Sequence, residues 1–490
     1  MILVTGGSGF IGANFILNWF SENEEPLVNL DKLTYASNQD NLKHLKNSEN
    51  YFFEKGDIGK IQRELRSIKQ SPSYILGKHI AESYPSVVKI AALPISLPIL
   101  AYRILTGKQT MDPSNISNFS NSNGKEKVRR NSIVFFPTNG VGFGHFTRTL
   151  AIARRLKKVN SDLEIVFVTT MPTLHPLSDE GFLTYHLPPR YRYEGMEPRV
   201  WNSLIEELMG TVFALHRPQM FVFDGSFPYR GMLNAIKNSE SMLKVWMRRG
   251  MFKSESKPIP AESINHFDAI IRPGDSSPTE KVPEVEHNAS IIGCNPITLL
   301  DEADQAPRGE LRRRLGIPSK AVVCYLQLGA GRINDISNEI RFTLDSLAKH
   351  PQIVTVVGES ILGERISYGE KSVRILRDYP NSMYFGDFDF AILAGGYNSY
   401  HEAIQSSLPT ICYPNTKTGT DDQLARAIVA EEAGCMIVVR KRKKSTISAA
   451  VDRIADLTVR EKMRLNIASL QRTNGAEQIS KWMNERLSQP

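Results

Sequence analysis

Three places in the chain combine a short apolar strand, a glycine-containing turn and a helix. They are ILVTGGSGFIGANF at residues 2–15, SIVFFPTNGVGFGHF at 132–146 and FAILAGGYNSYHEA at 390–403. Strands that alternate with helices form parallel sheets, because two consecutive parallel strands need a crossover between them. The sequence therefore predicts an α/β protein with more than one parallel sheet.

Length and local composition divide the chain into four parts. A length of 490 residues is enough for about three domains. An Asn- and Ser-rich segment at 112–130 is typical of a linker, and polarity rises again around 301–320. The predicted parts are a truncated dinucleotide-binding fragment (1–60), a connector with its linker (61–130), and two larger α/β domains (131–305 and 306–490).

Charge and cysteine content restrict the partners only loosely. The net charge of +8 suits an acidic partner such as a nucleotide or an anionic lipid surface, and we predict no nucleic-acid partner. The four cysteines show no C-x-x-C spacing, so neither a zinc site nor a disulfide framework is predicted. No signal-peptide pattern precedes the first strand, and a cytoplasmic location is expected.

The first glycine turn has the spacing of a dinucleotide-binding motif. Gly6, Gly9 and Gly12 permit a tight turn close to a pyrophosphate, which the following helix N-terminus attracts. Asp31 ends the next strand about 20 residues on, where a carboxylate can accept ribose hydroxyls. This pattern predicts a site for the adenosine diphosphate half of NAD.

Residues 1–59 resemble the N-terminal end of the dTDP-glucose 4,6-dehydratase family, through MILVTGGSGFIGANF, VNLDKLTYASNQDNL and GDI. The resemblance implies that Asp57 and Ile58 flank an adenine. It ends before the strands that would hold the nicotinamide. Tyr74 and Lys78 have the Tyr-x-x-x-Lys spacing of such enzymes but precede any fourth strand, so we interpret them as a coincidence and expect no redox chemistry.

Within the segment 85–108, the uncharged run from Ile90 to Tyr102 is too short for a membrane span and is broken by Pro94 and Pro98. A packed connector is the preferred interpretation. The alternative is an interfacial contact that, together with the basic run RKRKK at 440–444, brings the protein to the anionic inner face of the plasma membrane.

The second glycine turn carries a histidine. Gly140, Gly142 and Gly144 precede His145 at the start of a helix. A histidine at such a junction can reach into a cleft as a general base, and the helix N-terminus disfavours its cationic form. A loop that merely caps a helix is the alternative. We predict that His145 is catalytic.

The third turn opens a pattern suited to a nucleotide. Gly395 and Gly396 end a strand, and backbone N–H groups together with Ser399 can hold a diphosphate. Glu402, one turn further on, can accept both ribose hydroxyls. Asp422 and Gln423 open a later helix. The pattern as a whole predicts a nucleotide-sugar site.

Residues 131–470 resemble GT-B glycosyltransferases of the family that contains the lipid II N-acetylglucosaminyltransferase and monogalactosyldiacylglycerol synthases. The resemblance lies in GFGH at 142–145, LRRRLGIP at 311–318 and the 390–427 pattern. It implies two Rossmann-like domains facing a cleft, His145 as base, and Gln423 on the donor sugar. Two positions depart from the family pattern: Arg426 stands in place of Asn, and Ser407 in place of Gly.

These observations predict inverting, metal-independent transfer of a hexose or N-acetylhexosamine from a UDP-sugar to a hydroxyl of a glycan or lipid-linked acceptor, with no cofactor required. Three alternatives stay open. The first is a nucleotide-sugar hydrolase, which is favoured by the similarity of GHFTRTLAIA to the hydrolase of pseudaminic acid synthesis. The second is a binding module without turnover. The third is a bifunctional dehydratase-transferase, and the missing strands argue against it.

Overall fold

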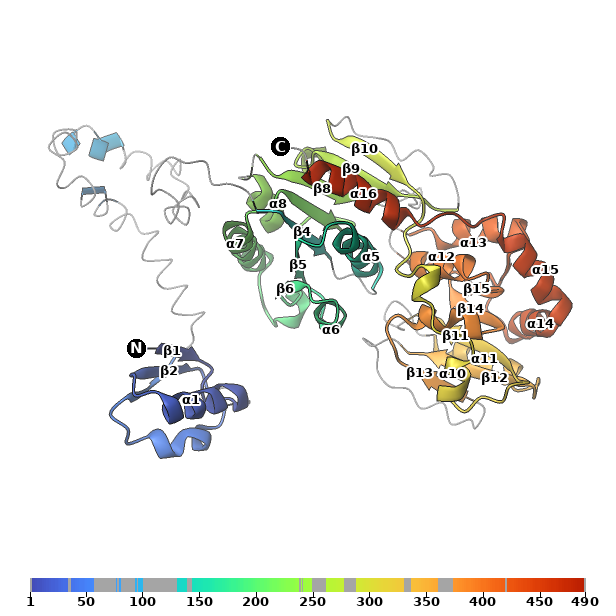
Figure 1. The fold of residues 1–490 in the computed structure, drawn as a ribbon, viewed down its shortest axis with the longest axis horizontal. Coiled ribbons are helices and arrows are strands. Elements are labelled where there is room, and N and C mark those ends of the chain that lie inside the picture. The colour runs from blue at the N-terminus through green and yellow to red at the C-terminus, as the bar shows by residue number, and fades with distance from the viewer. Residues whose placement is uncertain are drawn as a thin grey trace. The chain divides into compact units, whose positions relative to one another are not determined.

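The structure is a computed structural model. It describes residues 2–33, 37–56, 130–138, 143–237, 241–248, 261–276, 288–329, 336–359, 373–418 and 421–488, with residues 76, 79–80, 93–94, 96–99 and 239. The chain divides into two compact units, Met1–Glu126 and Lys127–Pro490 (Figure 1). Most of the predicted connector and linker lies outside the described residues, as do Tyr74 and Lys78.

The first unit contains a small parallel sheet in the order β1-β2-β3. Its elements are β1 (Ile2–Thr5), α1 (Phe10–Glu22), β2 (Leu27–Asp31), the 3₁₀ helix η1 (Gln39–Leu45) and β3 (Tyr51–Lys55). Ala13 and Ile16 of α1 are buried with Leu27 and Leu42. This is the predicted half of a doubly wound sheet.

Several apolar side chains of this unit remain uncovered. Leu3 is 59% exposed and Phe10 is 80% exposed, and Phe15 and Phe52 are also exposed. A three-stranded sheet with one covering helix buries too little surface to enclose them.

The second unit begins with a seven-stranded parallel sheet in the order β10-β9-β8-β7-β4-β5-β6. Its strands are β4 (Ser132–Pro137), β5 (Glu164–Thr169), β6 (Leu183–His186), β7 (Met220–Asp224), β8 (Leu243–Met247), β9 (Ala269–Pro273) and β10 (Ser290–Cys294). Its helical elements are α5 (Gly144–Val159), α6 (His175–Ser178), η3 (Arg190–Arg192), α7 (Pro198–His216), α8 (Arg230–Lys237) and α9 (Ala261–Ile264). We call this part the first lobe.

The second lobe is built on a six-stranded parallel sheet in the order β13-β12-β11-β14-β15-β16. Its strands are β11 (Val322–Gln327), β12 (Ile353–Gly358), β13 (Val373–Leu376), β14 (Phe390–Ala394), β15 (Thr410–Tyr413) and β16 (Met436–Val438). Its helical elements are η4 (Glu302–Asp304), α10 (Glu310–Arg314), α11 (Ser337–Leu347), η5 (Asn381–Asp387), α12 (Tyr397–Gln405), α13 (Gln423–Glu432), α14 (Lys444–Ala455) and α15 (Leu457–Ile467). The prediction of two sheets after residue 131 is confirmed.

Both sheets reverse their winding direction at the first strand. β4 pairs with β5 on one side and with β7 on the other, and β11 likewise pairs with β12 and β14. A crevice forms beyond the carboxyl ends of the strands at such a reversal, and ligands of open α/β sheets bind there. The third glycine turn of the sequence follows β14 and so opens on such a crevice, whereas residues 139–142 of the second, after β4, lie outside the described residues.

The last helix, α16 (Gly475–Leu487), returns to the first lobe. It packs against α5 (Figure 1), and Ala476, Ile479 and Met483 join the buried core on that side of the seven-stranded sheet. Gly475 begins the helix, and its N–H donates to the carbonyl of Pro296 over 2.9 Å. The first lobe is therefore completed by residues from the far end of the chain.

Substitution of Gly475 tests how closely α16 must approach the first lobe. A Cβ at this position would lie 2.0 Å from the carbonyl oxygen of Asn295. We expect Gly475→Ala to lower the free energy of unfolding by about 1–3 kcal/mol, the usual range for overpacking. At Gly210 in α7 a Cβ would meet no atom within 4 Å, so Gly210→Ala, the control, should stabilise by about 0.5–1 kcal/mol. Equal urea midpoints for the two variants would contradict the close approach.

Candidate active site

His145 is held by a buried carboxylate at the carboxyl end of the first sheet. It is the second residue of α5, and its Nδ1 lies 2.6 Å from Oδ1 of Asp224, the last residue of β7. Asp224 is fully buried, whereas 17% of the His145 side chain is exposed. The histidine therefore stands between a buried carboxylate and the crevice.

Arg148, one turn along α5, completes this cluster. Its Nε and Nη2 donate to the two oxygens of Asp224 over 3.1 and 2.6 Å, and Nη2 also lies 2.9 Å from Nδ1 of His145. Burial alone would raise the pKa of Asp224, but Arg148 and His145 outweigh this and hold that pKa below its ordinary value. The carboxylate is thus ionised, and it is the only one of the three groups that can accept the Nδ1 proton.

The predicted glycine loop is only partly described. Gly144 begins α5, and Gly140 and Gly142 lie outside the described residues. Asp224 and Arg148 were not predicted from the sequence. The sequence contained a signal for Asp224. This acidic residue ends the buried strand MFVFD, directly before a glycine, and Asp31 likewise ends a strand.

The third glycine turn leads into a helix whose N-terminus is open. Gly396 is the N-cap residue of α12 and makes no side-chain capping bond. The first helical bond runs from the N–H of Tyr400 to the carbonyl of Gly396, so the preceding N–H groups up to Ser399 have no acceptor within the helix. Gly395 is close-packed, because a Cβ there would lie 3.1 Å from Cβ of Gln423. This geometry suits a diphosphate.

Glu402 lies one turn into α12. Burial raises the pKa of its carboxyl to about 7, although the nearby Ser382 opposes this increase. Burial also raises the pKa of Tyr325 and of Tyr379, and the charge of Glu402 adds to both increases. Near neutral pH the Glu402 side chain is therefore balanced between its acid and its carboxylate form.

Asp422 and Gln423 are both engaged at the start of α13. Asp422 is the N-cap residue and accepts from the N–H of Ala425 over 3.0 Å. Oε1 of Gln423 accepts from the N–H of Asn415 over 3.0 Å. Ser407, where the family pattern has glycine, has φ of 51°, so the turn keeps the left-handed backbone that glycine favours.

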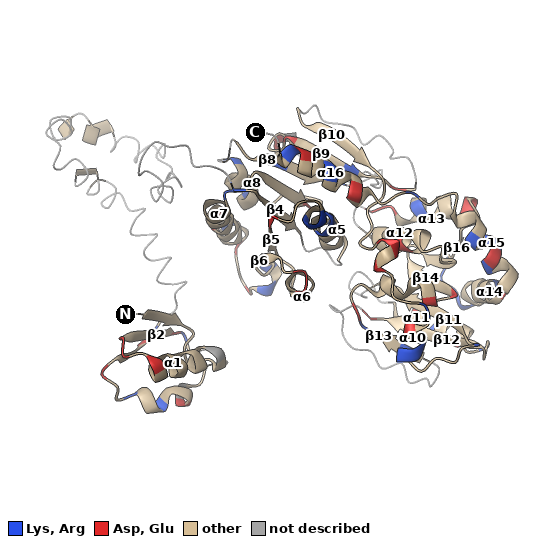
Figure 2. Ribbon diagram, viewed as in Figure 1, with Lys and Arg blue, Asp and Glu red and all other residues tan. Residues whose placement is uncertain are grey.

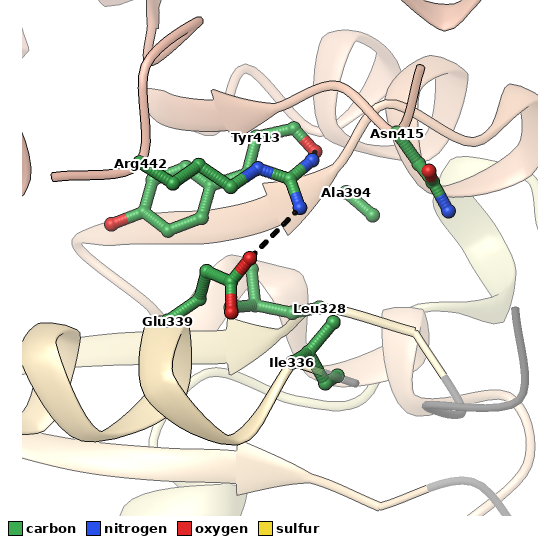
Figure 3. A pocket seen from close by; sticks show the side chains of 7 residues that line it. All are labelled: Leu328, Ile336, Glu339, Ala394, Tyr413, Asn415 and Arg442. Atoms are coloured by element: carbon green, nitrogen blue, oxygen red, sulfur yellow. Dashed lines mark hydrogen bonds and ion pairs between the residues drawn. The ribbon is translucent and has the colours of Figure 1, made fainter. Parts of the chain in front are cut away.

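A small cavity of about 10 Å³ opens at the carboxyl ends of β11, β14 and β15 (Figure 3). Its lining residues are Leu328, Ile336, Glu339, Ala394, Tyr413, Asn415 and Arg442. Arg442 donates to Glu339 over 3.3 Å and to the carbonyl of Pro414 over 2.7 Å. The cavity has room for about one water molecule, so these contacts mainly brace the strand ends beside Gly395.

The basic run at 440–444 is largely paired with acidic side chains. Arg440 pairs with Glu431, Arg442 with Glu339 and Lys444 with Asp345. Basic and acidic positions are also mixed along the nearby helix α15 (Figure 2). In the described part of the chain, no helix is both long and apolar enough to cross a membrane. Residues 85–92, 95 and 100–108 of the apolar stretch lie outside the described residues.

The described ranges contain no group of three or more His, Cys, Asp or Glu side chains that could hold a metal ion.

The first glycine turn has part of the geometry that NAD needs. Gly6 has φ of +72°, and a Cβ on Gly12 would lie 2.5 Å from the carbonyl oxygen of Gly6. Gly9 is the uncapped N-cap residue of α1. These features fit a diphosphate, although Asp57 and Ile58 lie outside the described residues.

Asp31 does not present itself to a ribose. It is 3% exposed and accepts from the N–H groups of Ser8 and Leu33 and from the hydroxyl of Ser37 over 2.7–2.9 Å. Burial raises its pKa, but these hydrogen bonds outweigh that and lower it overall. A role of Asp31 at a ribose therefore stays a prediction.

Comparison with known proteins separates the two units. Residues 2–87 match the model of the NAD dependent epimerase/dehydratase family. Over 57 residues the chain is 51% identical to a dTDP-glucose 4,6-dehydratase of Haemophilus influenzae and 53% identical to one of Xanthomonas campestris. The match covers 12% of this chain and only 17% and 16% of those enzymes. The first unit is thus an epimerase/dehydratase fragment.

The larger unit is similar to solved glycosyltransferases. A kitacinnamycin glycosyltransferase matches 72% of this chain and 98% of its own, with a TM-score of 0.51 and 12% identity. A calicheamicin glycosyltransferase matches 74% of this chain and 99% of its own, with a TM-score of 0.51 and 15% identity. At these identities the likeness establishes the fold. The main body has two Rossmann-like domains of the GT-B type, as predicted.

Replacement of Asp224 tests how much its carboxylate contributes to the stability of the fold. Asp224→Asn leaves the guanidinium of Arg148, which is 2% exposed, without a charged partner. We expect a loss of about 3 kcal/mol in the free energy of unfolding, near the lower end for a broken buried pair, because the amide can still accept one hydrogen bond. The control Glu431→Gln, which removes the exposed partner of Arg440, should cost less than about 1 kcal/mol. Similar losses in the two variants would contradict this account.

Proposed function

We propose that this chain transfers a sugar from a nucleoside-diphosphate sugar, with UDP as the nucleotide, to a hydroxyl of an acceptor, with inversion at the anomeric carbon. The observation that carries the proposal is the 2.6 Å contact between His145 and Asp224 in a GT-B fold. With its Nδ1 proton donated to Asp224, a neutral imidazole has its lone pair on Nε2. That nitrogen is the base.

The reaction is a single displacement. The acceptor hydroxyl gives its proton to Nε2 of His145 as its oxygen forms a bond to the anomeric carbon. The bond from that carbon to the diphosphate breaks on the opposite side, and the nucleoside diphosphate leaves with the electron pair. Asp224 stabilises the imidazolium that forms, in the same way that a buried carboxylate supports other histidine bases.

The open N-terminus of α12 supports the departing diphosphate. The backbone N–H groups of Asn398 and Ser399 can donate to its oxygens, and the helix dipole favours the negative charge that develops. In this proposal Glu402, one turn along the same helix, accepts the ribose hydroxyls. The sugar is a hexose or N-acetylhexosamine, and the acceptor a glycan or lipid-linked hydroxyl, by the family resemblance.

The first unit has no part in this chemistry. It supplies at most a diphosphate-binding turn, with Asp31 engaged in its own loop. The second half of a doubly wound sheet, which would hold a nicotinamide, does not follow among the described residues.

Incubation of the full chain with UDP-glucose, UDP-galactose or UDP-N-acetylglucosamine tests the proposal. We expect UDP release that depends on an added glycan or lipid extract, and no change in dTDP-glucose supplied with NAD. Release of UDP without acceptor would indicate a hydrolase, and binding without release a module that lacks turnover. A 4-keto-6-deoxy product from dTDP-glucose would show that the first unit is active.

Substitution of His145 tests the base. We expect His145→Ala to lower turnover by a factor of about 10² to 10⁴ with UDP affinity unchanged. The matched control is His350→Ala, because His350 also contacts a carboxylate, Asp452, over 2.9 Å, away from both crevices. An unchanged rate in His145→Ala would remove this residue from the mechanism.

The pH dependence of UDP binding tests Glu402. Only the carboxylate form accepts two ribose hydroxyls, and the pKa of about 7 means that this form is gained as pH rises from 6 to 8. We expect UDP affinity to increase about fivefold to tenfold over that range. Glu402→Gln should lose the part of this pH dependence that comes from ionisation of Glu402, so that only the titration of the UDP phosphate remains. The same pH profile in both proteins by calorimetry would place the ribose elsewhere.

A further inference from the structure

Tyr397, the first residue of α12, reaches from the second lobe into the first. Its hydroxyl donates to the carbonyl of Gly274 over 2.9 Å and accepts from the N–H of Ile297 over 3.1 Å. Gly274 directly follows β9 of the first lobe, and Ile297 lies just beyond β10. The side chain is 4% exposed. The residue that begins the candidate donor helix is therefore bonded to the backbone of the first lobe.

The ring of Tyr397 lies close to two arginines from different lobes. The guanidinium carbons of Arg148 and Arg426 each lie 5.6 Å from its centre. Arg148 is bound to Asp224 and contacts His145. The cluster of the proposed base and the start of α12 are consequently in direct contact through this ring.

Arg426 adds a second connection between the lobes. This fully buried residue donates from Nε and Nη2 to the carboxylate of Asp275, which follows Gly274 in the first lobe, over 2.8–3.0 Å. Its Nη1 donates to the carbonyl of Gly395 over 2.7 Å, and Nη2 also reaches Asp421 over 2.8 Å. An asparagine, which the family pattern has here, is too short and has too few donors to make all of these contacts.

We propose that Tyr397 and the Arg426–Asp275 pair are positioning residues, which fix the Gly395–Gly396 turn and the start of α12 against the His145–Asp224 cluster. The inference rests on the proposed function, because it gives these contacts the task of holding donor and base at reacting distance. Displacements of about 1 Å between reacting groups can cost a factor of about 10² in rate.

Binding of a ligand at the N-terminus of α12 should change the hydrogen exchange of the first lobe through these contacts. The diphosphate of UDP would bond to N–H groups of the turn that Tyr397 and Arg426 hold, and so stiffen that turn. The amide of Ile297 reports on the same link directly, because its acceptor is the hydroxyl of Tyr397.

Hydrogen exchange of the full chain with and without UDP tests this in the unaltered protein. We expect UDP to slow exchange in segment 395–405 and also in segment 288–300, which contains Ile297. Slower exchange in 395–405 alone would overturn this inference and leave the proposed function standing. UDP that leaves 395–405 itself unchanged would instead overturn the proposed function.

Tyr397→Phe removes the hydroxyl and keeps the ring. We expect UDP still to protect 395–405 but no longer 288–300, with kcat lowered about tenfold or more and the dissociation constant of UDP changed less than threefold. The kcat of Arg426→Lys should lie between the kcat of Tyr397→Phe and that of Arg426→Asn, because one ammonium can keep part of the Asp275 contact.

The matched control is Tyr384→Phe. Tyr384 is a buried tyrosine whose hydroxyl accepts from Arg314 within the second lobe. The Tyr384→Phe variant should have the same kcat and the same hydrogen exchange in segment 288–300 as the unaltered chain. Equal kcat in Tyr397→Phe and Tyr384→Phe would overturn the positioning role.

Discussion

The candidate active site of the larger unit depends on one buried carboxylate. Asp224 is buried at the end of β7, where an ionised group is tolerated only if it is fully paired. Arg148 supplies two hydrogen bonds and a positive charge, and His145 supplies a third bond. Because β7 and α5 both lie beside β4, the winding of the sheet brings these groups together. The chemistry of the histidine is thus a consequence of how a buried charge is stabilised.

The same logic recurs between the lobes. Asp275 is buried and is paired with Arg426, which is itself bonded to the carbonyl of Gly395. The carboxylate follows β9 of the first lobe and the guanidinium belongs to α13 of the second, so the pair joins the two lobes, while Asp421 gives Arg426 a further partner in its own lobe. Such a contact specifies a relative position more strictly than apolar packing does, because its hydrogen bonds are directional and leaving them unmade is costly.

Much of the fold could be predicted from the sequence, and only part of the site. The apolar run that precedes the second glycine turn forms strand β4 (Ser132–Pro137), because an uninterrupted apolar run beside a glycine turn leaves few alternatives. His145 and the Gly395–Gly396 turn were visible as local motifs. The pairing of Asp224 and of Asp275 was not, since their arginine partners are 76 and 151 residues away and only the tertiary fold brings them together. Asp31 ends β2 as predicted, but its hydrogen bonds with Ser8, Leu33 and Ser37 were not evident from the sequence.

The return of α16 to the first lobe has a consequence for how the chain is made. Ile479 and Met483 cover one face of a sheet whose strands lie between residues 132 and 294. During synthesis that sheet emerges long before its cover does, whereas domains usually fold as units in order from the N-terminus. Until α16 has been made, the part of this face that lies beside α5 lacks its cover. The first lobe is therefore completed only after the second lobe has been translated.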